Sequence, residues 1–375
     1  MGDMAADTAG TGTGTGIGTG IGTDDGFVPL RVRSIVRDTD ASVVVEFDTS
    51  DHPIPFAHGQ HLTIRRRFDG VEVRRSYSIC SPAPSGALRV AIKHVPDGVV
   101  SGWALRELQV GDTVDVLPPA GHFTHALDPS AVRRYALLAA GSGITPVFSI
   151  AATILEHEPR SSVDLLYVNR TSLSTMLLDD LHDLRDRHLG RLRVSFAFTR
   201  EDTGGELLSG RPDRGRLDAL IAAGLLPADA DHAFLCGPIE LITVAEAALV
   251  AAGMPGDRIH REIFTTNQPG QVRMAPQEIS DQAVVATGRA TLHGRTSTFE
   301  LYDGDTVLDA VQRVRPDAPF SCRSGVCSTC QAICTSGEVR MDVNYGLTDD
   351  EVARGYVLTC QSRPISGELT VDYDA

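Results

Sequence analysis

Four cysteines near the end of the chain have the type and spacing to hold an iron–sulfur cluster. Three of them stand within residues 321–330 in a C-x4-C-x2-C pattern, and the fourth ends a strand-like run much further along. They are Cys322, Cys327, Cys330 and Cys360. One loop can wrap a small inorganic core with three thiolates while the fourth arrives from a separate strand. Gly325 lets the loop backbone approach the core with no Cβ in the way. The spacing therefore predicts a [2Fe–2S] cluster.

Two other uses of these cysteines remain open. The four cysteines could instead ligate a structural zinc ion, although zinc sites more often combine two separated C-x2-C pairs. Disulfides are disfavoured because the sequence shows no export signal. Three more cysteines, Cys80, Cys236 and Cys334, are left as single thiols, and Cys334 is expected to be packed rather than ligating. This cysteine usage predicts a reducing, cytoplasmic location.

Charge and composition exclude several classes of partner. The 375 residues are enough for two or three domains with cores of their own. A formal net charge of −15 argues against nucleic acid and against an anionic membrane surface as partners. We expect no membrane span, since no run approaches the ~18 apolar residues that one requires.

Three segments are expected to fold and to position these residues, and each has its own pattern of polar and apolar positions. Residues 1–26 are a Gly/Thr-rich leader that we expect to be disordered. Residues 27–130 alternate polar and apolar residues in short runs, which predicts an antiparallel β-barrel or sandwich. One helix is expected within it, from Ser101 to Leu108, with Ser101 as the N-cap and an anion site at the helix start.

The second and third segments differ from the first. Residues 131–265 alternate strands and helices, which predicts an α/β domain with a parallel sheet and a ligand at the carboxyl ends of its strands. Residues 266–282 are polar with two prolines and predict a linker. Residues 283–375 combine short strands around the cysteine loop with one amphipathic helix, Val307–Val314. The chain is therefore predicted to be multidomain.

The barrel segment carries a motif that resembles one of the ferredoxin–NADP⁺ reductase superfamily. Arg75-Ser-Tyr77-Ser78 matches R-x-Y-S, and Gly98-Val-Val100-Ser101 resembles the family's second flavin element. The resemblance implies that Arg75 meets the FAD pyrophosphate and Tyr77 packs on the isoalloxazine, with Ser78 near the flavin N5. It also implies that the second element seats the pyrophosphate. The first domain is then a flavin-binding β-barrel.

The α/β segment extends this resemblance to a nicotinamide dinucleotide. The turn that would bind the pyrophosphate contains Gly141, Gly143 and Thr145. The residues that would line the nicotinamide are Cys236, Gly237 and Pro238. Ser78 and Cys236 would lie near the path of hydride transfer. Arg170 and Arg200 follow successive strands and suit a 2′-phosphate, whereas NAD sites tend to offer a carboxylate to the ribose. We therefore expect NADPH as the electron donor.

The C-terminal segment narrows the resemblance through three runs: Ser321-Cys-Arg-Ser-Gly-Val-Cys-Ser-Thr-Cys330, Gly337-Glu-Val-Arg-Met-Asp-Val-Asn-Tyr345 and Glu351-Val-Ala-Arg-Gly-Tyr-Val-Leu-Thr-Cys-Gln361. With them the chain resembles the reductase subunits of bacterial phenylacetyl-CoA epoxidases over about residues 27–375. The resemblance implies an α+β ferredoxin domain of β-grasp fold and a plant-type cluster. Electrons would pass from NADPH through FAD and [2Fe–2S] to a multisubunit di-iron oxygenase in phenylacetate degradation. A reductase of a Rieske-type ring hydroxylase or of a steroid monooxygenase is the alternative, and a redox sensor is one of another class. Residues 283–375 hold 8 Arg against 13 Asp and Glu, so we expect an acidic face that docks on a basic partner.

Overall fold

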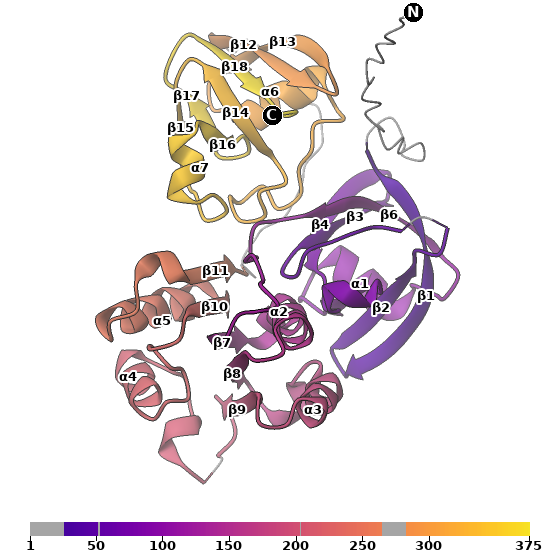
Figure 1. The fold of residues 1–375 in the computed structure, drawn as a ribbon. Coiled ribbons are helices and arrows are strands. Elements are labelled where there is room, and N and C mark those ends of the chain that lie inside the picture. Colours follow the sequence, from indigo (N-terminus) through magenta and orange to yellow (C-terminus); the bar gives the residue numbers. More distant parts are fainter. Residues whose placement is uncertain (1–25, 52, 203, 265–282) are drawn as a thin grey trace, which may run out of the picture.

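The computed structural model describes residues 26–51, 53–202, 204–264 and 283–375. Three large sheets divide these residues among three bodies that follow one another along the chain, and a small sheet of β15 and β17 belongs to the third body (Figure 1). The leader, apart from Gly26, and the linker at 266–282 lie outside the described residues. No helix in the described ranges is long and apolar enough to cross a membrane.

The first body is a six-stranded antiparallel sheet in the order β4-β3-β6-β1-β2-β5. Its strands are β1 (Val28–Thr39), β2 (Ser42–Asp48), β3 (His61–Phe68), β4 (Val71–Ser78), β5 (Leu88–Lys93) and β6 (Thr113–Ala120). The two edge strands meet where Ile79 bridges Val90 and the Cys80 N–H donates to the Arg89 carbonyl at 2.8 Å. The sheet is therefore closed into the expected barrel, around a core that includes Val45, Leu62 and Ile92.

The second body is a five-stranded parallel sheet in the order β11-β10-β7-β8-β9. Its strands are β7 (Arg134–Ala140), β8 (Ser162–Asn169), β9 (Leu192–Phe198), β10 (His232–Gly237) and β11 (Ile259–Ile263). Two helices pack on each face: α2 (Ile144–His157) and α3 (Leu178–Arg187) on one, α4 (Arg214–Ala222) and α5 (Ile239–Ala251) on the other. Short 3₁₀ turns stand at Gly141–Gly143, Ser172–Ser174, Glu206–Leu208 and Gly256–Arg258.

Helix α2 joins the barrel to the parallel sheet. Its apolar residues share one core with Cys80 and Ala91 of the barrel and with Phe234 of the sheet. The Ser149 hydroxyl donates to the Ser81 carbonyl at 2.7 Å. The Thr153 hydroxyl accepts from the Ala83 N–H at 3.0 Å, in the barrel's 3₁₀ turn Ala83–Ser85. The first two bodies are thus packed through a common core.

The third body is a mixed five-stranded sheet in the order β13-β12-β18-β14-β16, covered by α6, as in the expected β-grasp fold. Its elements are β12 (Val284–Leu292), β13 (Arg295–Tyr302), α6 (Val307–Val314), β14 (Gln331–Ser336), β15 (Val339–Met341), α7 (Asp349–Ala353), β16 (Tyr356–Leu358), β17 (Ser362–Pro364) and β18 (Glu368–Asp372). Both helices begin at capping boxes, Thr306 with Asp309 and Thr348 with Glu351. The predicted helix at Val307–Val314 is confirmed.

Candidate functional site: a cysteine loop, a barrel strand and two sheet-end turns

The cysteine loop turns its backbone N–H groups toward its own sulfur atoms. The N–H groups of Ser324 and Cys327 both donate to the Cys322 Sγ at 3.4 Å. Gly325 has a φ of 75°, and a Cβ there would lie 2.9 Å from the Val343 carbonyl oxygen. Glycine is thus required by its left-handed conformation and by this carbonyl. Donors aimed at sulfur stabilise the thiolate form, which is the form that binds iron.

The four thiols gather as two pairs rather than around one point. The thiol of Cys322 lies next to that of Cys327, and the thiol of Cys330 lies next to that of Cys360. Among the described residues, the only three potential ligands whose atoms all lie within 4.8 Å of one another are histidines elsewhere in the chain. Two pairs of sulfurs suit two irons, whereas a single zinc ion needs four ligands around one centre. The arrangement fits a [2Fe–2S] cluster.

Cys334 lies on β14, and its thiol contacts the turn at the end of that strand. Its Sγ is 3.5 Å from the Ser336 carbonyl oxygen and 3.7 Å from that of Gly337. Burial raises the pKa of this thiol.

Strand β4 touches the cysteine loop along one of its edges. The Ser76 hydroxyl donates to the Ser321 hydroxyl at 2.8 Å, one residue before Cys322. The Arg74 guanidinium lies over the buried Phe320 ring, 4.1 Å from its centroid. His122, just after β6, also reaches the third body and lies 3.2 Å from the Gln331 side chain. The R-x-Y-S strand and the cysteine loop are therefore in direct contact.

The other residues of the motif lie on the same strand. Arg75 donates to the Arg74 carbonyl at 2.7 Å, and burial raises the pKa of the Tyr77 phenol. Ser78 is buried, and its hydroxyl donates to the Glu262 carboxyl at 3.4 Å. The end of β4 thus faces β11 of the parallel sheet.

The Glu262 carboxyl accepts hydrogen bonds from both Ser78 and Cys236. Glu262 pairs with Cys236 across β10 and β11, and the Cys236 thiol donates to the same carboxyl oxygen that Ser78 reaches, at 3.9 Å. Burial raises the pKa of Glu262 to about 8, and burial together with Glu262 raises the pKa of the Cys236 thiol. At neutral pH the Glu262 carboxyl is therefore mostly protonated.

The two turns at the carboxyl ends of β7 and β10 are packed backbone against backbone. A Cβ on Gly143 would lie 2.2 Å from the Cys236 carbonyl oxygen, and one on Gly237 would lie 2.8 Å from the Ala140 Cβ. Gly141 has a φ of 55°. The Thr145 hydroxyl donates to the Ser142 carbonyl at 3.0 Å, and Pro238 is the N-cap of α5. The structure thus brings the G-S-G turn and the C-G-P turn together.

The two arginines expected at the adenosine end are neighbours. The Arg200 N–H donates to the Arg170 carbonyl at 2.9 Å, and both residues are exposed at the carboxyl ends of β8 and β9. Next to Arg170, Asn169 is buried as the last residue of β8.

The second flavin element differs from the expectation in its capping. Helix α1 runs from Val99 to Arg106, so its N-cap is Gly98 rather than Ser101. Ser101 is buried in the first turn, where its hydroxyl accepts from the Val95 N–H and donates to the Gly98 carbonyl, both at 3.1 Å. The prediction of Ser101 as N-cap is wrong, because Ser101 closes the preceding turn. Val100 is buried beside it, and no side chain caps the helix start.

Comparisons with known proteins assign these three bodies. Residues 28–125 match the model of an oxidoreductase FAD-binding domain, residues 137–247 that of an oxidoreductase NAD-binding domain, and residues 290–364 that of a 2Fe-2S iron–sulfur cluster binding domain. The chain is 39% identical to one of the subunits of the 1,2-phenylacetyl-CoA epoxidase of Escherichia coli, over 93% of this chain and 98% of the relative. The chain belongs to the ferredoxin–NADP⁺ reductase type of oxidoreductase with a C-terminal ferredoxin domain. It is thus an NAD(P)H-dependent electron-transfer enzyme with FAD and [2Fe–2S] sites.

Other members of this reductase type serve oxygenases of different kinds. The chain is 35% identical to the ferredoxin reductase component of the 3-ketosteroid-9-alpha-monooxygenase of Mycobacterium tuberculosis, over 93% of this chain and 97% of the relative. The solved structure of phthalate dioxygenase reductase superposes with a TM-score of 0.58 at 25% identity, over 93% of this chain and 98% of that one. The expected modular architecture is confirmed.

Sequence reasoning missed two residues of this reductase site. One is Glu262, which only the pairing of β10 with β11 brings to Cys236. The other is Lys93, the last residue of β5, whose Nζ would lie 3.7 Å from a Cβ on Gly141. Burial, followed by the charge of Arg170, lowers the pKa of Lys93. The available signal was that Lys93 is the chain's single lysine and ends a strand next to the second flavin element.

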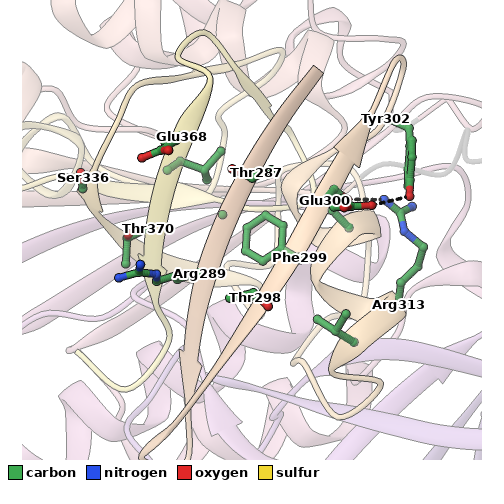
Figure 2. Close-up of a pocket in the computed structure, with 14 residues that line it drawn as sticks. Thr287, Arg289, Thr298, Phe299, Glu300, Tyr302, Arg313, Ser336, Glu368 and Thr370 are labelled. Carbon is green, nitrogen blue, oxygen red and sulfur yellow. Dashed lines mark hydrogen bonds between the residues drawn. The ribbon is translucent and has the colours of Figure 1, made fainter. Parts of the chain in front are cut away.

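A surface hollow of about 650 Å³ lies on the ferredoxin domain, away from this site (Figure 2). Its lining comes from β12, β13, α6, β14 and β18, and none of it from the cysteine loop. On one side the Tyr302 hydroxyl donates to the Glu300 carboxylate at 2.8 Å, and Arg313 donates to the Glu300 carbonyl at the same distance. The hollow is therefore not part of the contact between cysteine loop and barrel.

Proposed function

We propose that this chain takes electrons from NADPH and delivers them, in the cytoplasm, to a multisubunit di-iron oxygenase that epoxidises phenylacetyl-CoA. The support for this partner is the 39% identity to a protein of the Escherichia coli epoxidase over nearly the full length of both chains. A reducing compartment is supported by the single thiols Cys80, Cys236 and Cys334, none of which is in a disulfide.

The proposed electron path is supported by one observation, which is that strand β4 contacts both the nucleotide domain and the cysteine loop. At Ser78 the strand meets Glu262 of the nucleotide domain, which Cys236 also contacts, and two residues earlier Ser76 meets the cysteine loop. Two residues of extended strand span about 7 Å. When bound, the flavin accepts an electron pair from a nicotinamide, and the cluster passes electrons on one at a time. The chain's own contribution is to hold both sites against the same short length of strand.

Roles for the barrel and sheet residues follow from their places. Arg75 and the uncapped start of α1, formed by Gly98, Val100 and Ser101, would hold the FAD pyrophosphate. Tyr77 would pack on the ring system and Ser78 would hydrogen-bond near the reacting edge. The NADPH pyrophosphate would bind the turn of Gly141, Gly143 and Thr145, with Lys93 beside it. Cys236, Gly237 and Pro238 would line the nicotinamide, and Cys322, Cys327, Cys330 and Cys360 would ligate the cluster.

Preference for NADPH over NADH is proposed from the charges at the ends of β8 and β9. Arg170 and Arg200 are adjacent and exposed there. The neighbouring carboxylate, Glu201, accepts hydrogen bonds from the Ser172 N–H at 2.9 Å and from its hydroxyl at 3.0 Å, so it is engaged within the protein. Two guanidinium groups suit a 2′-phosphate better than a ribose hydroxyl.

Steady-state kinetics with the two nucleotides tests this preference. Replacing Arg170 or Arg200 by Ala should lower kcat/KM for NADPH by about tenfold or more, the worth of a hydrogen bond to a charged group, and leave NADH unchanged. The control is Arg258→Ala, an exposed arginine before β11 at the opposite ends of the strands. Equal losses with both nucleotides would contradict the assignment.

The oxygenase partner is tested by reconstitution. The 35% identity to a 3-ketosteroid monooxygenase reductase makes a steroid hydroxylase the second candidate. Purified reductase should support NADPH-driven turnover by a phenylacetyl-CoA epoxidase at substoichiometric amounts, and should support a 3-ketosteroid monooxygenase poorly. Higher coupled turnover with the steroid enzyme would reverse the choice of partner while leaving the electron path intact.

A further inference from the structure

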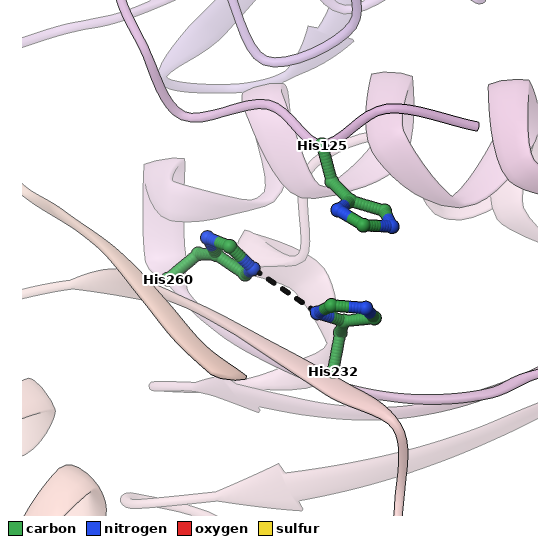
Figure 3. A group of neighbouring side chains, drawn as sticks. All are labelled: His125, His232 and His260. Carbon is green, nitrogen blue, oxygen red and sulfur yellow. Dashed lines mark hydrogen bonds between the residues drawn. The ribbon is translucent and has the colours of Figure 1, made fainter. Parts of the chain in front are cut away.

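Three histidines converge where the barrel connects to the parallel sheet. His125 lies in the segment between β6 and β7, His232 is the first residue of β10, and His260 is the second residue of β11 (Figure 3). One nitrogen from each ring can be chosen so that all three lie within 4.8 Å of one another. None of these residues takes part in the electron path described above.

The strand register accounts for this convergence. Phe234 pairs with His260 across β10 and β11, and residues two apart on a strand point to the same face, so His232 and His260 share a face. His125 packs on that face, with its ring centroid 3.9 Å from that of His232. His260 stacks on Phe234 at 4.5 Å, which holds its ring in place. The three side chains come from separate elements and are oriented by packing.

The spacing of the nitrogens is close to that of a tetrahedral metal site. The His260 Nε2 and the His232 Nδ1 are 3.3 Å apart. Two imidazole nitrogens bound at about 2.05 Å to one tetrahedral ion are separated by about 3.3 Å. These two rings therefore already have the separation that a shared ion requires, and His125 has to move inward by about 1.5 Å at most.

The charge state of the cluster also suits a cation. Burial, with the neighbouring histidines, lowers the pKa of His232 and of His260 to about 4, and burial lowers that of His125. All three rings are therefore neutral at pH 7 and have a lone pair to offer. The nearest cation is Arg133, whose Nη1 lies 3.2 Å from the His125 Nε2 and 2.9 Å from the buried Glu158 carboxylate. Glu158 offsets the charge of Arg133 and can hold it when His125 turns inward.

We propose that His125, His232 and His260 form a binding site for a divalent transition-metal ion of the zinc class, with water completing the coordination. Three imidazoles without a carboxylate or thiolate select Zn²⁺, Co²⁺, Ni²⁺ or Cu²⁺ over Mg²⁺ and Ca²⁺. All three residues are only half-buried, which leaves the site accessible to solvent. It lies at the amino ends of the strands, four residues or about 13 Å along β10 from Cys236. A bound ion would fasten the connecting segment to the sheet and so stabilise the arrangement of barrel and nucleotide domain.

The test is a Zn²⁺ titration of the holoprotein, with FAD and cluster in place, against a chromophoric competitor. We expect one zinc per chain in addition to the cluster iron, and a melting temperature that rises with Zn²⁺. His260→Gln should lower the zinc affinity by about 100-fold or more, since loss of even an outer partner of a ligand costs 10–100-fold. His125→Asn should do the same without altering either strand. His94→Gln, an exposed histidine of the barrel, is the matched control and should bind like the parent.

Iron content and visible absorbance, read from the same samples, distinguish this site from the cysteine loop. Zinc uptake that matches the loss of iron, or that persists in both histidine variants, would place the ion at the cysteines and overturn the proposal. No uptake at about tenfold excess over protein would also overturn it.

Discussion

Replacing Glu262 by Gln should remove most of a pH dependence that the half-buried carboxyl imposes on stability. The carboxyl has a pKa of about 8 in the folded protein against an ordinary value of 4.5. At pH values between these two pKa values, Glu262 therefore holds a proton in the folded state and has lost it in the unfolded state. Stability is fully present below the lower value, is lost as pH rises toward the upper one, and changes little beyond it.

The size of this effect follows from the shift. At about 1.36 kcal/mol per pKa unit, raising the pH from about 5 to about 9 costs the wild-type protein about 4 kcal/mol through this one group. A shift of that size corresponds to a melting temperature lower by about 10 °C in a domain of this length. Gln keeps an oxygen that accepts from Ser78 and Cys236, as the protonated acid does, and does not ionise. The variant should match wild type near pH 5 and be more stable at pH 9.

The assay is thermal unfolding across this pH range, followed by flavin fluorescence and by circular dichroism. Glu206→Gln, an exposed carboxyl in the same domain, controls for the loss of one negative charge. The same series should be repeated for NADPH-driven dye reduction, where we expect wild type to lose activity above about pH 8 and the variant to keep it. Parallel stability profiles for wild type and E262Q would refute the assignment of Glu262 as a carboxyl that is mostly protonated in the folded protein at neutral pH.

Three further outcomes are expected. Gly143→Ala should destabilise the nucleotide domain by about 3 kcal/mol or more in denaturant unfolding, because its Cβ meets a backbone carbonyl, whereas Gly256→Ala, which has open space, should be tolerated. Ser76→Ala removes a hydrogen bond to the cysteine loop worth about 1 kcal/mol, so cluster reduction in stopped flow should slow up to about fivefold while dye reduction stays unchanged. Because residues 283–375 are acidic, oxygenase-coupled turnover should fall as salt rises past about 0.15 M, and salt-independent coupling would contradict docking by charge.

The sequence was sufficient to predict a feature of the structure wherever the signal for it lies in neighbouring residues. The spacing of the cysteine loop, the alternation of the barrel strands and the turn at Gly141 each depend on a few consecutive positions. The helix at Val307–Val314 matches the observed bounds because Thr306 and Asp309 form a capping box within one turn. By contrast, Ser101 was misassigned as an N-cap because its hydroxyl bonds to Val95 and Gly98, which precede the helix.

The residues that were missed depend on contacts between distant elements. Glu262 reaches Ser78 only because β11 pairs with β10 and the barrel closes against that edge. The three-histidine cluster similarly needs the register of β10 with β11 and the course of the segment before β7. Neither is encoded in a local pattern, since a lone carboxylate or histidine in a strand has no spacing to recognise. The domain limits at 27–130, 131–265 and 283–375 stay predictions.

In the proposed electron path, one strand links a hydride-accepting flavin site to a [2Fe–2S] site. The most direct measurement is an anaerobic titration with NADPH, followed by visible absorbance and EPR, of wild type and of Cys327→Ser. Wild type should bleach in the flavin and cluster bands and develop the EPR signal of a reduced [2Fe–2S] centre. The variant should lose that signal yet still oxidise NADPH with a dye as acceptor. A wild-type protein whose flavin is reduced while its cluster stays oxidised would contradict the account.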